Sequence, residues 1–285
     1  MRNSKKISSW EKAVIQIKKD PQKKDLVLAA YYDDPLLKSA KRYFSSDEWL
    51  AIRNFLPKGL KKSVLDVGAG RGIASYALAR EGFIVSAIEP DASFIVGAGA
   101  IKNLAHKTKL PITVIQEFSE KLPFSDQSFD VVFVRAVLHH TKNLKDACKE
   151  FFRVLKPGGI LIAVREHVIS KPQDLKAFFE IHPLHKLYGG ENAFQLSVYK
   201  DAIVSAGFRL KHVIGPLDSP INLAPHTKSS FKKELSNFLS NKTRLPANVF
   251  NRSFNISFVW IPFFYALKFF DNRPGRLYSF VAKRP

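Results

Sequence analysis

The chain has 285 residues, of which 46% are hydrophobic, so it is long enough to bury the core of one large domain. Its formal net charge of +20 lies mainly in the flanks: basic and acidic residues number 15 and 7 over 1–62, 13 and 11 over 63–170, and 17 and 7 over 171–285. A single cysteine excludes an internal disulfide framework, and the lysine-rich start lacks the continuous apolar run of a cleavable signal peptide, so we expect a cytoplasmic protein.

Residues 1–62 are expected to form an N-terminal helical segment, or cap. The first 25 residues are polar, and helix-like segments between 26 and 55 carry many aromatic side chains. These aromatic residues are Tyr31, Tyr32, Tyr43, Phe44, Trp49 and Phe55. They either cover the entrance of a binding site or simply pack against the rest of the fold, and both interpretations stay open.

The segment 64–72 reads V-L-D-V-G-A-G-R-G and is the most informative stretch of the chain. A short apolar strand leads to Asp66, and a helix is predicted over 73–80. Between them stand three alternate glycines, Gly68, Gly70 and Gly72. Backbone N–H groups at such a helix start can hold an anionic or polar ligand, and glycines let it approach closely. A dinucleotide loop would need its third glycine where Ile73 stands, so that ligand is not predicted.

A second buried strand is predicted over 82–88, and it ends at Glu89. A carboxylate at this place can accept hydrogen bonds from both hydroxyls of a ribose. The alternative is a solvated acid at a strand end. With the glycine loop upstream, we predict that Glu89 binds a ribose.

The core continues with L-P-F at 122–124, S-F-D at 128–130, an apolar strand over 131–134, L-H-H at 138–140, and L-K-P-G-G at 155–159 before a strand over 160–164. Together with D-x-G-x-G-x-G, this string resembles the class I S-adenosylmethionine-dependent methyltransferases, in particular their small-molecule-type members. The resemblance covers about residues 64–164. It implies an enzyme that uses S-adenosyl-L-methionine as its cofactor.

The resemblance also implies which residues contact the cofactor: Asp66, Gly68, Gly70, Gly72, Glu89 and Arg135. In much of the family a G-D-A-E run precedes L-P-F, and its aspartate meets the adenine amino group. Here the run is E-F-S-E, and Phe118 stands in the place of that aspartate. Glu117 could replace it from one position away, backbone groups of Phe118 and Ser119 could read the base, or the Phe118 ring could stack on it. Glu117 and Phe118 are therefore predicted cofactor contacts as well.

Strands and helices alternate from residue 63 onward with short connections, which predicts an α/β fold with a parallel sheet and helices on both faces. The resemblance makes this a Rossmann-like, seven-stranded sheet, mostly parallel, with an antiparallel last strand. We expect a cofactor-binding core over 63–214 with an insertion at 166–195, an insertion or lid over 215–275, and the last core strand over 276–285. Both are expected to be helical insertions at the carboxyl edge of the sheet, where ligands bind in such folds.

The stretch 254–270 is very apolar, but it is short and is interrupted by Asn255, Pro262 and Lys268. A convincing membrane span would need a longer uninterrupted run. A buried helix is the preferred interpretation. Peripheral membrane contact, favoured by the flanking Lys and Arg residues, and a surface for a partner protein are the alternatives.

Methyl transfer is an in-line displacement in which the protein mainly positions two reactants, and an oxygen acceptor also profits from a general base. Candidate catalytic residues stand at the ends of predicted strands: His139, His140 and His167. Candidate substrate contacts follow in the same region: Glu166, His182, His185, Tyr188 and Glu191. The spacings of these histidines and acids match none of the usual zinc patterns, so no metal site is predicted.

The preferred function is O-methylation of a small-molecule or glycan-type acceptor. An RNA methyltransferase is the first alternative, because basic flanks attract nucleic acid. Against it, the residues after the strand at 131–134 read R-A-V-L, where an N-P-P-Y-type motif for amino methylation would stand. The second alternative is a non-catalytic cofactor-binding protein that serves as an assembly or membrane-associated factor.

Overall fold

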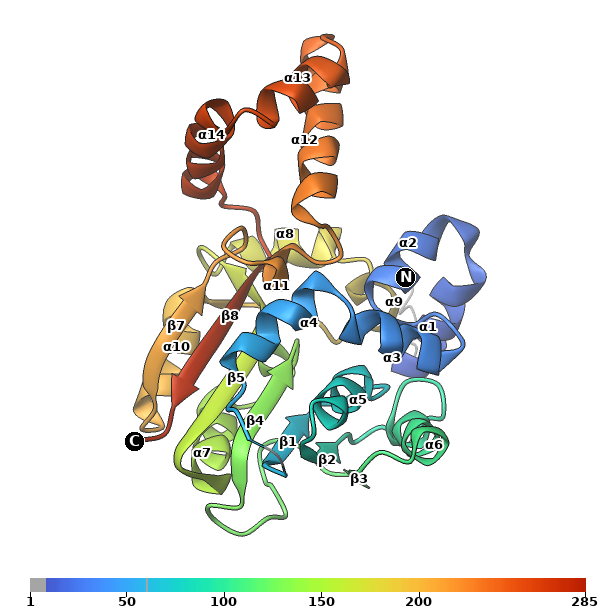
Figure 1. Cartoon of the computed structure of the whole chain (residues 1–285), viewed down its shortest axis with the longest axis vertical. Helices are drawn as coiled ribbons and strands as arrows, with labels where there is room; N and C mark the ends of the chain where they lie inside the picture. Colours follow the sequence, from blue (N-terminus) through green and yellow to red (C-terminus); the bar gives the residue numbers. More distant parts are fainter. Residues whose placement is uncertain (1–8, 60) are drawn as a thin grey trace, which may run out of the picture.

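The computed structural model describes residues 9–59 and 61–285, and its centre is an 8-stranded sheet (Figure 1). The main strand order is β3-β2-β1-β4-β5-β8-β7, and the short strand β6 pairs with β5. The strands are β1 (Ser63–Val67), β2 (Ile84–Ile88), β3 (Ile112–Ile115), β4 (Phe129–Arg135), β5 (Leu155–Ile169), β6 (Phe194–Gln195), β7 (Arg209–Ile214) and β8 (Arg276–Lys283). Strands β1 to β5 pair in parallel, and β8 is antiparallel to β5 and β7. The predicted α/β fold with an antiparallel last strand is thereby confirmed.

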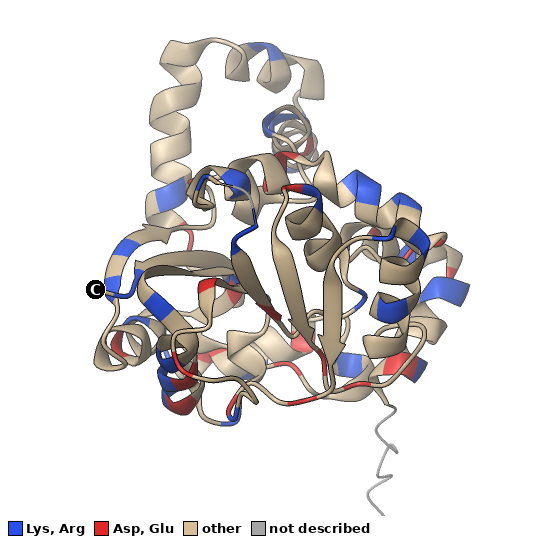
Figure 2. Cartoon of the chain, turned by 60° about the horizontal axis from the view of Figure 1, so that its bottom comes forward, with Lys and Arg blue, Asp and Glu red and all other residues tan. Residues whose placement is uncertain are grey.

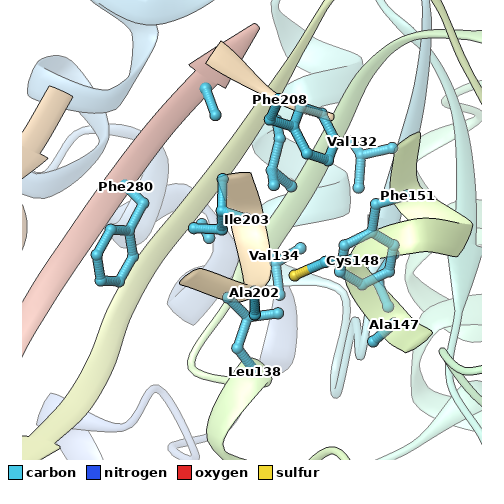
Figure 3. Close-up of a cluster of buried hydrophobic side chains, with 14 of the residues drawn as sticks. Val132, Val134, Leu138, Ala147, Cys148, Phe151, Ala202, Ile203, Phe208 and Phe280 are labelled. Carbon is cyan, nitrogen blue, oxygen red and sulfur yellow. The ribbon is translucent and has the colours of Figure 1, made fainter. Parts of the chain in front are cut away.

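One face of the sheet is covered by α7 (Leu144–Val154) and α10 (Leu196–Ser205). Val132 and Val134 of β4 meet Phe151 and Ile203 of these helices in a buried cluster (Figure 3). Cys148 lies in the same cluster, and burial raises the pKa of its thiol to about 12. The single cysteine of the chain is therefore a packing residue.

The opposite face is covered by α3 (Leu36–Phe44), α4 (Asp47–Ile52) and α5 (Ile73–Arg80). Val131 and Phe133 point to this side because successive strand residues alternate between the two faces. They pack with Tyr43 and Trp49 from the N-terminal helices. Helices that precede β1 are thus part of the main core.

The sheet itself carries few charged residues, because most Lys, Arg, Asp and Glu residues are on helices and loops (Figure 2).

Further helices and short turns lie around this sandwich. The helices are α1 (Trp10–Lys19), α2 (Lys24–Ala29), α6 (Ala98–Thr108), α8 (Asp174–Ile181), α9 (His185–Tyr188) and α11 (Pro220–Leu223), and the 3-10 turns are η1 (Pro21–Lys23), η2 (Arg53–Phe55) and η3 (Leu138–His140).

Strand β5 is much longer than the predicted strand over 160–164. It continues because β8 pairs with it twice, first along 160–163 and again along 166–168 after an irregularity. The short β6, which was not predicted, pairs with its last residues. As a result, His167 lies within a strand instead of after one.

Three helices between β7 and β8 form an arm that projects from the carboxyl edge of the parallel strands, orange to red in Figure 1. The arm consists of α12 (Lys228–Thr243), α13 (Ala247–Phe254) and α14 (Ser257–Phe270). The preferred prediction of a buried helix is wrong for α14: none of its residues is buried, and Phe258 and Phe269 are 87% and 84% exposed. The reason is that its aromatic contacts stay within the arm, where Trp260 and Phe263 pack on Phe254 and leave the outer side uncovered.

Within the described ranges, no single helix is long and apolar enough to cross a membrane. Helices α13 and α14 meet that measure only as a pair, and they are bent by 100° at the break between them.

Several predicted segment boundaries fall at element ends, whereas the boundary at 166 lies inside β5. Residue 63 begins β1, residue 214 ends β7 and residue 276 begins β8. The segment 215–275 contains α11 and the arm, while 166–195 contains α8 and α9 together with strand residues. The division of the chain into these domains stays a prediction.

Candidate functional site

A cavity of about 570 Å³ opens at the carboxyl edge of the parallel strands. Most of the predicted site residues line it: Asp66, Gly68, Gly70, Glu89, Glu117, Phe118, Arg135, His139, His140, His167, His182, Tyr188 and Glu191. The strand order β2-β1-β4-β5 places Glu89 and His167 three strand spacings apart, roughly 14 Å. The cavity therefore has a glycine-loop end and a histidine end. A depression of similar volume between η2 and β7 contains none of the predicted residues.

Glycine is required in the loop after β1 for two different reasons. Gly68 and Gly70 have φ of 62° and 54°, in the left-handed region that favours glycine. A Cβ on Gly68 would lie 2.5 Å from the Val137 side chain, whereas a Cβ on Gly70 would meet no atom closer than 4.0 Å. Gly68 thus allows close packing, and Gly70 faces open space. Gly72, with φ 81°, begins α5 without lining the cavity, so it shapes the loop.

Two carboxylates accompany this loop. Glu89 accepts hydrogen bonds from the backbone N–H of Gly70 at 2.8 Å and of Asp91 at 3.0 Å, and burial raises its pKa against the effect of these bonds. Asp66 is buried and accepts a 2.5 Å hydrogen bond from Ser75. Burial raises the pKa of Asp66 to about 7, because the Ser75 bond offsets only part of the desolvation.

Arg71, inside the glycine loop, fastens the N-terminal segment to the site. It donates to the carbonyl oxygens of Tyr31 and Asp33, both at 3.1 Å, and to the Asp34 carboxylate at 2.6 Å. The sequence analysis missed this role, although the arginine within a loop of small residues was the available signal.

Some of the N-terminal aromatic residues line the cavity, and others pack in the core, as the two open interpretations of the sequence expect. Tyr31 and Tyr32 line the cavity, as does Trp10 of α1. Tyr43 and Trp49 are fully buried against the sheet instead. The N-terminal segment therefore contributes both a wall of the cavity and a part of the core.

Arg135 lines the cavity, but its charge is already paired. Its Nε and Nη2 donate to the two oxygens of Glu48 at 2.7 and 3.1 Å, and Arg165 lies 3.9 Å from the same carboxylate. The Glu48 side chain is fully buried and comes from α4, so these charges join the N-terminal helices to the end of β4 and the interior of β5. Nothing in the local pattern D-E-W-L marks a buried acid, and the sequence analysis missed Glu48.

Glu117 and Phe118 stand on the loop after β3 at the rim of the cavity. The Phe118 ring is 61% exposed and lies 5.8 Å from the ammonium group of Lys142. An exposed ring at the rim is free to receive a flat ligand. Its role toward adenine stays a prediction.

At the histidine end, His139 lies between two carboxylates. Its Nδ1 is 2.6 Å from Glu166 Oε2, and its Nε2 is 3.4 Å from Glu191 Oε2. Burial lowers the pKa of His139, but the two carboxylates outweigh burial and raise the pKa to about 9.

The prediction that Glu166 contacts the substrate needs correction. Glu166 is fully buried, does not line the cavity, and accepts hydrogen bonds from the backbone N–H of Val137 and His139 at 3.1 Å each. Because β5 runs on past this residue, its side chain is enclosed behind His139. Glu166 positions that imidazole and the turn after β4.

Glu191 faces the cavity and lies within reach of several hydrogen-bond donors. Tyr188 donates its hydroxyl to Glu191 Oε1 at 2.7 Å, and His140 Nε2 lies 3.7 Å from Oε2. Burial raises the pKa of Glu191, but the hydrogen bond from His139 and the nearby His140 and His182 outweigh burial and hold the pKa well below its usual range.

Two further imidazoles are oriented by backbone carbonyls. Nδ1 of His140 is 3.0 Å from the carbonyl oxygen of Gly190, and Nδ1 of His167 is 2.9 Å from that of Gly275. A carbonyl only accepts, so Nδ1 carries the proton in the neutral rings and Nε2 keeps a lone pair. Burial and the neighbouring His139 lower the pKa of His167 to about 3.

The last two predicted histidines differ in placement. His182 lines the cavity and lies 5.1 Å from the His167 ring. His185 does not line the cavity, because its ring stacks on Phe179 with the ring centroids 4.0 Å apart. The predicted substrate contact of His185 is therefore corrected.

Three non-glycine residues that line the cavity have left-handed backbone conformations. They are Tyr31, Ala136 and Arg165, with φ of 59°, 56° and 63°. Such conformations cost free energy and persist where the surroundings fix them, which is common at functional sites. Ala136 and Arg165 re-aim the chain at the ends of β4 and within β5, beside the histidines.

The glycine-loop end fits the cofactor that the resemblance implies. Gly70 leaves the space above the loop open, and Glu89 presents acceptor oxygens at the end of β2, where a ribose binds in such folds. Glu89 also presents a carboxylate to the cavity, which suits a cofactor that carries a positive sulfonium.

Comparison with known proteins agrees with this geometry. Residues 65–163 match a family model described as a methyltransferase domain. The ubiquinone biosynthesis O-methyltransferase of Coxiella burnetii is 36% identical over 135 residues, which cover 47% of this chain and 52% of that protein. A tRNA U34 carboxymethyltransferase of Desulfotalea psychrophila is 29% identical over 119 residues, covering 41% and 37% of the two chains.

The fold comparison extends further along the chain. The solved structure of an S-adenosylmethionine-dependent methyltransferase from Mesorhizobium loti matches with a TM-score of 0.57 at 16% identity, covering 85% of this chain and 100% of that chain. The chain spans about half the length of the curated relatives it matches, or less. The family match itself includes the glycine loop, Glu89 and the histidine pair. Residues 65–163 therefore match a methyltransferase domain, and the fold around them is shared with a solved S-adenosylmethionine-dependent methyltransferase.

Proposed function

We propose that the chain transfers the methyl group of S-adenosyl-L-methionine to a hydroxyl of a small-molecule or glycan-type acceptor. One observation carries this proposal: a single cavity joins the glycine loop and Glu89 to a cluster of histidines and acids. The cofactor supplies an activated methyl group, so the main task of the chain is to hold two reactants in line.

In this proposal the two ends of the cavity have separate tasks. Glu89 accepts hydrogen bonds from the ribose, and the loop at Gly68 and Gly70 encloses the methionine part of the cofactor. Phe118 at the rim packs on the adenine. The support is the open space at Gly70 and the fixed carboxylate of Glu89.

The acceptor is proposed to bind at the histidine end. His140, His167, His182 and Glu191 offer polar atoms there, which suits an acceptor with oxygen substituents. Trp10, Tyr32 and Leu184 supply apolar walls that exclude water (a small acceptor needs such an enclosure). We assign His139, His140 and His167 to the acceptor side of the reaction.

Titration calorimetry with S-adenosyl-L-methionine tests the cofactor end. We expect Gly70→Arg to abolish binding, because the new side chain would fill the open space above the loop. Glu89→Ala is expected to weaken binding about tenfold or more, the loss of roughly 1.4 kcal/mol or more from charge-assisted hydrogen bonds.

Gly158→Arg is the matched control for the loop variant. Gly158 also has a left-handed backbone, with φ 78°, and a Cβ there would lie 3.9 Å from Lys283 in ordinary contact. It lies near the start of β5, at the irregularity between Leu155 and Ile160 in the pairing with β4, and outside the cavity. Equal loss of binding in both variants, or no binding by a folded wild-type protein, would count against the proposal.

A nucleic-acid acceptor is the second candidate, favoured by the charge distribution. Basic residues exceed acidic ones by 15 to 7 over 1–62 and by 17 to 7 over 171–285. Transfer of labelled methyl groups from the bound cofactor separates the candidates. Labelled RNA, formed in a strongly salt-dependent reaction, would replace the small-molecule assignment. Cofactor binding without transfer to either class would favour a non-catalytic factor.

We also propose that the outer side of α14 contacts a membrane surface. Its support is the exposure of Phe258 and Phe269, together with 8 basic against 3 acidic residues over 215–275. Exposed aromatic side chains beside basic ones suit the interface of an anionic bilayer.

A further inference from the structure

The histidine end of the cavity has the composition of a cation site. Donor atoms of His139, His167 and Glu191 all lie within 4.8 Å of one another. His140 lies beside this group, with its ring centroid 4.1 Å from that of His139 and its Nε2 3.7 Å from Glu191 Oε2. Two imidazoles and one carboxylate are a sufficient set of protein ligands for a divalent metal ion.

The hydrogen-bond partner of Nδ1 in each imidazole also supports a cation site. Nδ1 of His139 meets Glu166 at 2.6 Å, while Nδ1 of His140 and of His167 meet backbone carbonyls at 3.0 and 2.9 Å. Metal-binding histidines are held in this way, with one ring nitrogen donating to a carboxylate or carbonyl so that the other is fixed as the ligand. All three rings therefore keep Nε2 as the ligating atom.

The charges of the two carboxylates around His139 also favour a bound cation. Glu166 and Glu191 are 0% and 7% exposed, so two carboxylates are buried on either side of the His139 ring. Among the residues that the structure describes, their ion-pair partners are His139 and His140, with no Lys or Arg. One imidazolium leaves this group negative, whereas a divalent cation with neutral imidazoles balances both carboxylates.

We propose that His139, His167 and Glu191, joined by His140, bind a late first-row divalent metal ion such as Zn²⁺. Ligand atoms on a tetrahedral zinc ion lie about 3.3 Å apart, and the 3.4 Å between His139 Nε2 and Glu191 Oε2 already fits. The share of nitrogen ligands disfavours Mg²⁺ and Ca²⁺, which take oxygen ligands.

No metal site was predicted from the sequence, because the ligands are far apart along the chain. They come from three separate segments: the 3-10 turn after β4, the interior of β5, and the turn after α9. Only the long β5 and the pairing of its second half with β8 bring His167 beside His139. No spacing motif within one segment announces such a site.

The test uses the full chain, freed of any polyhistidine tag and treated with a chelator. Co²⁺ is titrated first, because its visible absorption reports the ligand set, and Zn²⁺ is then added in competition. We expect about one ion per chain, and at least tenfold weaker binding for Glu191→Gln and for His167→Gln. Glu166→Gln should weaken binding by about tenfold to a hundredfold, as loss of an orienting partner does.

His106→Gln is the control, because His106 is exposed in the last turn of α6. It should bind Co²⁺ as the wild-type chain does. Thermal unfolding of each variant checks that it is folded, and the two ligand variants keep the test valid if one of them fails to fold. The proposal is overturned if the wild type binds no Co²⁺, or binds it no better than Glu191→Gln and His167→Gln.

The same samples keep this proposal distinct from the proposed function. Gly70→Arg should lose the cofactor and keep the metal ion, since the loop lies at the other end of the cavity. A wild-type chain that binds the cofactor but not the metal ion would reject the metal site alone. A wild-type chain that binds the metal ion but not the cofactor would reject the proposed function alone.

Discussion

The burial of Asp66 should make the free energy of unfolding of the protein depend on pH. Burial raises its pKa from 3.8 to about 7, so the folded chain holds a proton there that the unfolded chain releases near pH 4. The folded state then binds more protons between these values, and the free energy of unfolding falls as pH rises from about 4 to about 7. The upper limit of this fall is about 4 kcal/mol, at about 1.4 kcal/mol per pH unit.

Asp66→Asn removes this titration and tests the assignment. The free energy of unfolding of the variant is measured by urea unfolding without cofactor between pH 4.5 and 8. We expect it to fall less with rising pH than that of the wild type, because the asparagine side chain does not titrate. Its stability relative to wild type should therefore increase with pH. Asp146→Asn, at an exposed residue of α7, should follow the wild-type profile. Parallel profiles for Asp66→Asn and wild type would show that Asp66 is ionised throughout.

Prediction of single site residues from the sequence was limited by burial. Gly68, Gly70 and Glu89 could be placed because each stands at the end of a predicted strand, and strand ends meet at one edge of the sheet. Glu166 also follows a predicted strand, but it is enclosed, since β5 does not end there. Glu48 could not be found, because its role depends on Arg135 and Arg165, which are more than 80 residues away.

At the scale of elements, α4 is attached to the sheet by charge as well as by packing. Glu48 of α4 pairs with Arg135, the last residue of β4, and lies near Arg165 of β5, with its side chain fully buried. Removing one partner of such a group leaves the others buried without compensation.

Glu48→Ala should therefore destabilise the chain by about 3 kcal/mol or more, measured as a lower midpoint in urea unfolding. Asp146→Ala breaks a solvent-exposed pair with Lys149 and should leave the midpoint nearly unchanged. A small effect of Glu48→Ala, equal to that of the control, would mean that water reaches the two arginines.

Helices and strands with local signals could be predicted closely, and those that depend on distant partners could not. The helix over 73–80 coincides with α5 because the glycine before it and its alanine-rich sequence define it locally. The second half of β5 and all of β6 exist through pairing with each other and with β8. The apolar sequence of α14 indicated burial, but composition does not specify whether a second surface is present to cover it.

At the scale of the whole molecule, the arm is the feature that separates this chain from a plain sandwich of sheet and helices (Figure 1). The proposed membrane contact of α14 predicts that wild-type protein cosediments with anionic lipid vesicles. Phe258→Ser combined with Phe269→Ser should reduce the bound fraction at least tenfold, since each buried Phe contributes about 1.5–3 kcal/mol.

Phe94→Ser is the matched control, because Phe94 is 80% exposed on the loop after β2, away from the arm. It should bind vesicles as wild type does. Equal binding of the double variant and wild type, or equal binding to vesicles of zwitterionic lipid, would contradict a basic and aromatic membrane contact.

Gly275, where the arm returns to the sheet, connects two distant parts of the protein. Its N–H donates to the Val168 carbonyl at 3.0 Å, and its own carbonyl holds the His167 ring at 2.9 Å. Displacement of this return segment therefore alters the orientation of an imidazole inside the cavity. Thermodynamic reciprocity then requires that whatever locks the imidazole also restrains the root of the arm. A surface contact outside and an occupied cavity inside would thus be coupled through a single residue, Gly275.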